Sequence, residues 1–135
     1  MINIKLVVVG KLKEKFHKDE INEYLKRLSR YSKVNIIEVE EEKIKEDEFV
    51  FLLDLHGKEI SSEDFAQKLN DLSLNYSTIT FVIGGSLGVS DELRKRSNFK
   101  LKLSPMTFTH QMTRIIILEQ IYRAFKIKNN ETYHK

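Results

Sequence analysis

The sequence contains no cysteine, and Pro105 is its single proline. Without cysteine the chain can form no disulfide bond, no thiolate metal site and no cysteine nucleophile. It also has no long apolar run, because the N-terminal segment 1–10 (MINIKLVVVG) is too short to span a bilayer and has no small-residue cleavage site. We therefore interpret this segment as a first strand. We expect a cytoplasmic protein whose partners include neither a membrane nor a metal.

Positive and negative side chains are almost equal in number. The 23 lysines and arginines against 20 aspartates and glutamates leave a formal net charge of +3, which alone says little about nucleic acids. The charges are unevenly distributed, because segment 38–48 is acidic whereas segments 11–18 and 94–102 are basic. Two basic stretches would steer RNA or DNA to one side of the molecule. For each stretch taken alone, a solvated loop or helix surface is the simpler interpretation.

The chain of 135 residues is long enough for one domain with a single core, and no repeat or low-complexity linker divides it. Strand-like and helix-like patterns alternate from residue 49 onward, which indicates an α/β fold with a mostly parallel sheet flanked by helices. The expected strands are 2–9, 34–39, 49–55, 78–85 and 99–103. The expected helices are 19–31, one that begins after Ser61, a short one from Ser90, and 109–126.

Unusual residues follow three of the expected strands. Ligands of open α/β sheets bind beyond the carboxyl ends of the strands, and these ends carry LDLHGK (53–58), IGGSLG (83–88) and SPMTFTHQMTR (104–114). The glycines of 83–88 allow the backbone to approach a ligand closely. Their spacing matches neither the Walker nor the dinucleotide-binding pattern, so a tight turn explains this segment equally well.

Pro105 stiffens the third of these segments. Its ring fixes its own φ and biases Ser104 toward an extended conformation. An extended stretch can present backbone N–H and C=O groups to a purine edge. The alternative is a simple strand-to-helix turn with Thr107 or Thr109 as the helix cap, and these residues alone favour that turn.

Segment 109–126 has apolar side chains nearly all the way round its helix, which predicts burial on every side. One small domain can hardly enclose such a helix, so we expect part of it to meet a partner chain in a symmetric homodimer. Two polar pairs at four-residue spacing interrupt it. Glu119 with Arg123 favours a structural ion pair, whereas His110 with Arg114 is equally consistent with an ion pair and with a site.

Taken together in order, these segments resemble the SPOUT-class methyltransferases that modify nitrogen 3 of a pseudouridine in large-subunit ribosomal RNA, near the decoding centre. The resemblance is carried by LDLHGK, FVIGGSLG, LSPMTFTHQMTRIIILEQIYRAFKI and the terminal YHK, and by KLVVVGKLKEK and EYLKRLSRY near the N-terminus. It implies a C-terminal deep trefoil knot, an exception to the rule against knotted chains. It also implies S-adenosylmethionine as methyl donor, a homodimer with its sites near the interface, and the assembled ribosome as substrate.

The resemblance further assigns roles to residues. Donor contacts are implied at Leu53, Gly84, Leu103, Ser104, Pro105, Met106, Thr107 and Phe108, so that the proline-stiffened stretch would be the knot loop around the donor. Implied RNA-binding or catalytic residues are His110, Arg123, Tyr133, His134 and Lys135. We hypothesise that His110 or His134 assists removal of the proton on nitrogen 3. Arg123 and Lys135 would hold phosphates, and Tyr133 would stack on a base.

Two features depart from the family pattern. The family has proline directly before the histidine that matches His110, where this chain has Thr109. The family also carries a longer helical segment between its second and third strands, where only residues 40–48 remain, so we expect the strand order or the covering of that edge to differ. Two alternatives stay open, namely another SPOUT reaction such as methylation of transfer RNA, and a non-catalytic RNA-binding dimer on the ribosome.

Overall fold

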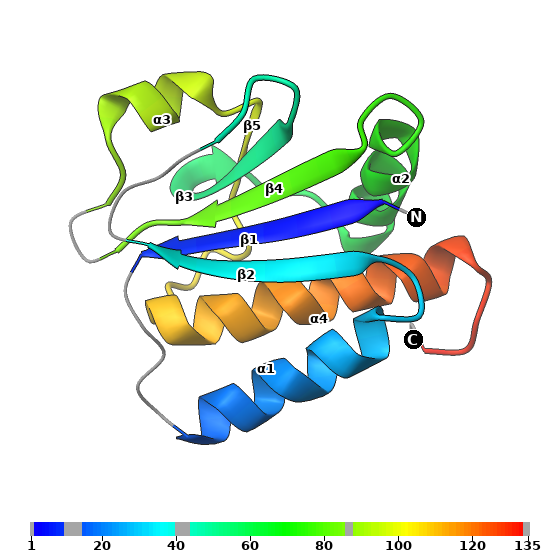
Figure 1. Cartoon of the computed structure of the whole chain (residues 1–135). Helices are drawn as coiled ribbons and strands as arrows, with labels where there is room; N and C mark the ends of the chain where they lie inside the picture. Colours follow the sequence, from blue (N-terminus) through cyan, green and yellow to red (C-terminus); the bar gives the residue numbers. More distant parts are fainter. Residues whose placement is uncertain (1, 10–14, 40–43, 86–87, 134–135) are drawn as a thin grey trace.

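The computed structural model describes residues 2–9, 15–39, 44–85 and 88–133. Its elements are β1 (Asn3–Val9), α1 (Lys15–Leu28), β2 (Lys33–Val39), β3 (Phe49–Lys58), α2 (Ser62–Leu72), β4 (Thr78–Ile83), α3 (Asp91–Arg96), β5 (Phe99–Leu101) and α4 (His110–Lys128). The strands form one sheet in the order β2-β1-β4-β3-β5, and every neighbouring pair is parallel (Figure 1). The predicted α/β fold with a parallel sheet flanked by helices is therefore confirmed.

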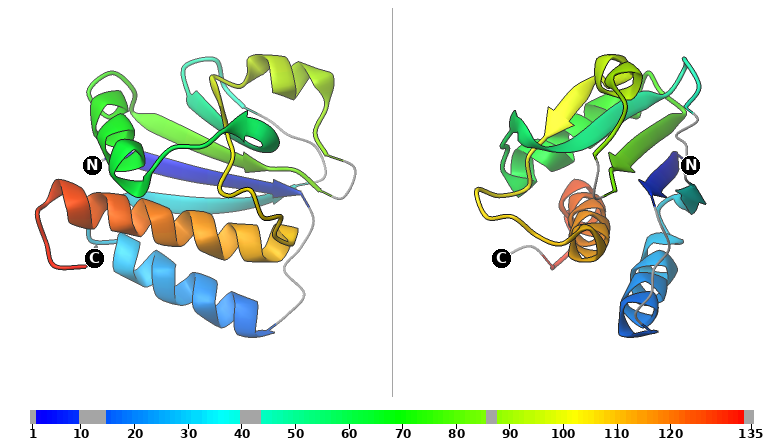
Figure 2. Two further views of the ribbon diagram at one scale, coloured as in Figure 1. Left: turned by 180° about the vertical axis from the view of Figure 1, so that it is seen from behind. Right: turned by 90° about the vertical axis from the view of Figure 1, so that its left-hand side faces the viewer.

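Helices α1, α2 and α4 all cover one face of the sheet (Figure 2). Every second residue of the inner strands points to this face, and the rings of Phe51 and Phe81 stack there with their centroids 4.8 Å apart. Ile117 and Ile121 of α4 have no exposed surface and close this core from below. Burial of such large side chains is the main source of folding free energy, at about 1.5–3 kcal/mol each.

The opposite face is covered by much less structure. Five buried side chains form a second, smaller cluster there: Val7, Val50, Leu52, Val82 and Leu93 of α3. Ile44, from the linker between β2 and β3, packs against it. Parallel sheets normally have helices on both faces, so a six-residue helix and a linker do here what longer helices usually do.

The linker between β2 and β3 is described from residue 44 onward, and Ile44 packs on this second face. The linker begins at the edge strand β2 and must pass β1 and β4 before it enters β3. The described part, residues 44–48, is a turn rather than a helix. The covering of this face therefore differs from that expected of a βαβ crossover, as the shortened segment predicts.

Three side-chain caps start the helices that follow residue 60. Ser61 Oγ accepts a hydrogen bond from the Asp64 amide at 3.0 Å, and Ser90 Oγ accepts one from the Leu93 amide at 3.2 Å. Thr109 Oγ1 accepts from the Met112 amide at 3.2 Å, so Thr109 rather than Thr107 is the N-cap of α4. A threonine in the position of the family's proline thus has a structural task of its own.

The single chain encloses helix α4 to a greater extent than we expect of one small domain. It lies between α1 and α2 on the sheet face that these helices cover, and seven of its residues are buried within the single chain. Met112, at its first turn, remains 40% exposed. Among the described residues, no helix has both the length and the apolar character needed to cross a membrane.

Strand β3 runs to Lys58 rather than to the expected residue 55, because it contains a bulge. Leu53 and Lys58 both pair with Leu101 of β5, so the residues between them leave the ladder and rejoin it. Gly57 makes the return possible, since a Cβ atom there would lie 2.6 Å from the carbonyl oxygen of Lys100. The obstacle is backbone and cannot be moved by a change of rotamer.

We expect Gly57→Ala to lower the free energy of unfolding by about 1–3 kcal/mol, because the added methyl group would push β3 and β5 apart. Urea denaturation followed by far-UV circular dichroism measures this. Ser77→Ala, at an exposed position before β4, is the control and should change stability little. An unchanged midpoint for Gly57→Ala would mean that the close approach to β5 is not a constraint.

Candidate functional site

A cavity of about 410 Å³ opens at the carboxyl ends of β3, β4 and β5. Its walls come from the three segments that the sequence singled out, which the parallel sheet brings to one edge. The volume lies within the usual range for small-molecule sites, about 300–1,000 Å³. Its lining combines apolar side chains with a few polar groups and glycine backbone.

Seven of the eight expected donor-contact residues line this cavity: Leu53, Gly84, Leu103, Ser104, Met106, Thr107 and Phe108. Pro105 does not, and its side chain is exposed. Segment 104–109 contains no helix or strand, and the Met106 amide donates to Ser104 Oγ at 3.0 Å. The segment therefore forms a cavity wall without regular secondary structure, and a hydrogen bond to Ser104 stabilises its turn.

The glycine segment forms another wall and is also a tight turn. The Gly88 amide donates to the Gly85 carbonyl oxygen at 2.9 Å, and Gly88 has a φ of 79°. A Cβ atom at Gly84 would lie 3.0 Å from the carbonyl carbon of Gly88 and from Val89 Cγ1. The tight turn predicted for these glycines is therefore present, and the close approach of their backbone to a ligand stays a prediction.

An ion pair that the sequence did not predict lies in the cavity wall. Asp54, at the start of the β3 bulge, accepts hydrogen bonds from Arg94 Nη1 of α3 at 2.5 Å and from the His56 amide at 3.0 Å. Its side chain is only 7% exposed. Burial acts to raise the pKa of Asp54, but the His56 amide and Arg94 outweigh it, so the pKa lies below the ordinary value of 3.8. An aspartate directly after the apolar run 49–53 was the available signal for this pair.

His110 and Arg114 are separated by the structure. His110, the first residue of α4, lines the cavity. Arg114 is 3% exposed and lies 3.7 Å from Glu38 of β2, measured from Nη1 to Oε1. Burial lowers the pKa of Arg114, and the Glu38 carboxylate offsets this in part. Only His110 therefore belongs to the cavity, while Arg114 belongs to the packing of α4 on the sheet.

Arg123 forms the ion pair with Glu119 that the sequence favours. Arg123 Nη2 lies 2.6 Å from Glu119 Oε1, and the Tyr133 hydroxyl donates to the same oxygen at 3.2 Å. The Arg123 guanidinium also lies 5.0 Å from the centre of the Tyr133 ring. Burial, followed by the Glu119 charge, raises the pKa of Tyr133 to about 12. Its hydroxyl therefore keeps its proton at neutral pH.

The C-terminal segment is attached to the body of the protein as far as it is described. Glu131 accepts hydrogen bonds from the Tyr31 hydroxyl at 2.8 Å and from Lys126 Nζ at 3.0 Å. Residues that are tied down in this way do not fray freely. The last two implied site residues, His134 and Lys135, lie outside the described residues.

The implied site residues thus fall into two groups at opposite ends of α4. His110 lies with the cavity, whereas Arg123 lies with Tyr133. At 1.5 Å per residue, positions 110 and 123 are about 20 Å apart along the helix. In the described part of the chain, no cluster of three or more histidine, aspartate or glutamate side chains is placed to hold a metal ion.

Comparison with known proteins shows the family of this chain. A family model described as "Predicted SPOUT methyltransferase" matches residues 2–134. The chain belongs to the SPOUT methyltransferase family. Two relatives named ribosomal RNA large subunit methyltransferase H, from Clostridium tetani and Clostridium acetobutylicum, are 48% and 46% identical over 99% of this chain and 100% of their own length.

A solved structure has the same fold. It is a methylase family protein from Haemophilus influenzae, which superposes with a TM-score of 0.61 over 94% of this chain and 66% of that chain. The sequence identity of 11% makes this a likeness of fold alone.

This SPOUT family chain is shorter than its relatives. The alignments extend over 159 positions and include 99% of the 135 residues here, so about 25 of their positions have no residue in this chain. That difference agrees with the absence of a helical segment between the second and third strands that the resemblance implies.

We expect Asp54→Asn to lower the free energy of unfolding by about 1 kcal/mol at pH 7, a value reduced by the partial exposure of Arg94. Because the folded-state pKa of Asp54 is lowered, the wild-type advantage is present above its ordinary value of 3.8 and is lost as the pH falls through the lowered value. Urea denaturation of both proteins between pH 2.5 and about 7 measures this. A difference that did not change with pH would contradict the ion pair.

Proposed function

We propose that this protein is an S-adenosylmethionine-dependent methyltransferase that acts on nitrogen 3 of a pseudouridine in large-subunit ribosomal RNA. Family membership and the names of the relatives support the reaction and the substrate class. The observation that carries the proposal is the cavity, because residues that the resemblance implies as donor contacts meet there from three separate strand ends. We take residues 1–135 as one domain, the protein as cytoplasmic, and the assembled ribosome as the substrate.

The cavity suits the chemistry of this donor. Leu53, Leu103 and Phe108 provide apolar surface for a flat base, while Ser104 and Thr107 bring hydroxyl and backbone groups. Gly84 lets the chain pack closely on Gly88 and Val89 in this wall, where a Cβ atom would lie 3.0 Å from each. When bound, the donor supplies a methyl group on a sulfonium, so the protein's own contribution is binding, orientation and electrostatics.

Removal of a proton is the second task of the site. As the nitrogen–carbon bond forms, the electron pair of the broken sulfur–carbon bond returns to sulfur, and the proton on nitrogen 3 has to leave. His110 lines the cavity at the start of α4, as His56 of the β3 bulge also does, and we propose that the His110 imidazole accepts this proton. His134 of the tail is the other candidate.

The separation of the two residue groups favours a site shared between two protomers. Arg123 and Tyr133 lie about 20 Å along α4 from His110 of the same chain. In a homodimer with its sites near the interface, the tail of one protomer can reach the cavity of its partner. Arg123 and Lys135 would then hold phosphates and Tyr133 would stack on a base. Segment 103–108 would be the loop of a C-terminal trefoil knot.

We expect calorimetric titration with S-adenosylmethionine to give a dissociation constant on the order of micromolar, as is usual for enzyme substrates. Phe108→Ala should weaken binding about ten-fold, because it removes apolar contact surface from the cavity wall. Leu74→Ala is the matched control, since Leu74 is also an exposed apolar residue but lies after α2, outside the cavity.

No binding to the folded wild-type protein would contradict the proposal and favour the non-catalytic RNA-binding dimer. If the donor binds, transfer of labelled methyl groups to ribosomes or to transfer RNA separates the ribosomal reaction from another SPOUT reaction. Mapping the modified nucleotide then tests the assignment of the acceptor atom.

Deletion of residues 133–135 should abolish methyl transfer and leave donor binding within about two-fold of wild type, because the tail would contact RNA rather than the donor. Calorimetry and methylation of ribosomes from a strain that lacks the modification measure the two effects. Asn129→Ala, which removes one side-chain contact at the end of α4, serves as the control. Unchanged methylation by the truncated protein would refute a role for the tail.

A further inference from the structure

The short linker between β2 and β3 has to be held in place by something other than its own helix. Residues 40–48 must return from the level of Val39 to that of Phe49, which is level with Val34, roughly 17 Å along the strands, and cross three strand spacings, roughly 14 Å. The linker can reach about 30 Å when fully extended, so it has little length to spare. The polar contacts at its described end show what holds it.

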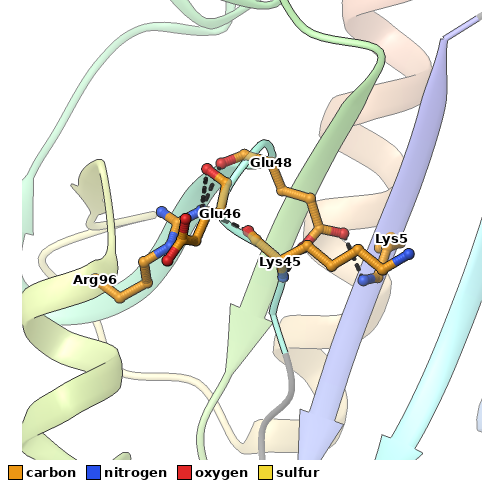
Figure 3. Close-up of polar contacts among 5 residues, drawn as sticks. All are labelled: Lys5, Lys45, Glu46, Glu48 and Arg96. Carbon is orange, nitrogen blue, oxygen red and sulfur yellow. Dashed lines mark hydrogen bonds and ion pairs between the residues drawn. The ribbon is translucent and has the colours of Figure 1, made fainter.

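Arg96, the last residue of α3, holds the linker backbone. Its Nη2 donates to the carbonyl oxygens of Lys45 at 2.7 Å, Glu46 at 3.2 Å and Glu48 at 2.8 Å (Figure 3). Its Nη1 donates to Asn98 Oδ1 at 3.1 Å, and that oxygen also accepts from the Val50 amide. One guanidinium therefore donates to three carbonyl oxygens of the linker, of which that of Lys45 also accepts from the Glu48 amide at 3.4 Å.

Glu48 fixes the same turn to the sheet. Its side chain is 4% exposed, and its carboxylate accepts from Lys5 Nζ of β1 at 2.5 Å and from the Lys45 amide at 2.8 Å (Figure 3). A buried carboxylate needs such partners, because an unpaired charge at this depth would be very costly. The turn is thus held from the sheet by Lys5 and from α3 by Arg96.

The same short helix also carries a wall of the cavity. Two residues before Arg96, Arg94 forms the ion pair with Asp54 beside the cavity. Leu93, between α3 and the sheet, is 6% exposed in the second cluster. A helix of six residues has too few internal hydrogen bonds to hold its own position. These three side chains therefore determine where α3 lies.

We propose that Arg96 is a positioning residue of the donor site, which fixes α3 against the linker and thereby holds Arg94 and Asp54 in the cavity wall. The proposal rests on donor binding in this cavity, as the proposed function states. Arg96 itself contacts neither the cavity nor any residue implied to bind the donor. The contact between Arg96 and the linker depends on the short linker, which lets the turn at 45–48 reach the end of α3.

The test compares Arg96→Ala, Arg96→Lys and wild type by calorimetry with S-adenosylhomocysteine and by hydrogen exchange of the α3 amides. We expect Arg96→Ala to raise the dissociation constant about ten-fold, because small misplacements of binding groups have large effects. Faster exchange over residues 91–96 should accompany it. Arg96→Lys should restore binding only in part, since an ammonium lacks the planar array of donors that reaches three carbonyls.

Two controls separate positioning from general loss of stability. Arg27→Ala removes an exposed guanidinium from α1, and Ile36→Val weakens the core on the opposite face of the sheet. Both should leave the dissociation constant unchanged, even where the melting temperature falls as far as in Arg96→Ala. In methylation kinetics, Arg96→Ala should raise the Michaelis constant for the donor and leave the Michaelis constant for ribosomes unchanged.

A double-mutant cycle tests the route through Asp54. In an Asp54→Asn background, Arg96→Ala should weaken donor binding by clearly less than ten-fold, because the effects of two mutations on one connected network do not add. Full additivity, or unchanged binding and exchange in Arg96→Ala, would overturn the proposal. If wild type binds no donor, the proposed function fails, and α3 exchange alone then decides whether Arg96 holds the helix.

Discussion

The parallel direction of β3, β4 and β5 is the constraint on which the rest of this structure depends. Parallel neighbours end at the same edge, so three segments that lie 20 to 50 positions apart in the sequence become the walls of one cavity. The bulge in β3 turns Asp54 and His56 into that cavity, and the close approach of Gly57 to β5 returns the strand to the ladder. The same strand pairing that forms the sheet therefore also brings the walls of the cavity together.

The two faces of the sheet are stabilised by different means. One face has three helices and a large aromatic and aliphatic core, whose burial supplies most of the folding free energy. The other has a small cluster under α3 and a turn held by Lys5, Glu48 and Arg96. A buried polar network of this kind contributes little net stability but specifies one arrangement, because each partner is costly to leave unpaired. A chain shorter than its relatives thus keeps its second face ordered with directional bonds instead of additional apolar surface.

Helix α4 connects the two polar groups of the C-terminal half. Its first residue, His110, faces the cavity, and its last turns carry Arg123 and the contacts to Tyr133 and Glu131. Because a helix is a rigid spacer, these groups keep a separation of about 20 Å within one chain. The proposed site shared between two protomers rests on that separation.

Local signals in the sequence determined much of this protein. The apolar runs of the strands, the serine caps at Ser61 and Ser90 and the family motifs were readable because each depends on residues a few positions apart. Only the tertiary structure decided that Arg114 is buried against Glu38, that Asp54 pairs with Arg94, and that Arg96 holds the linker. Those partners are 40 to 76 positions apart, carry no periodicity, and look like ordinary surface charges until the sheet brings them together. A charged residue's role is set by its partner in space, which the order of residues alone does not specify.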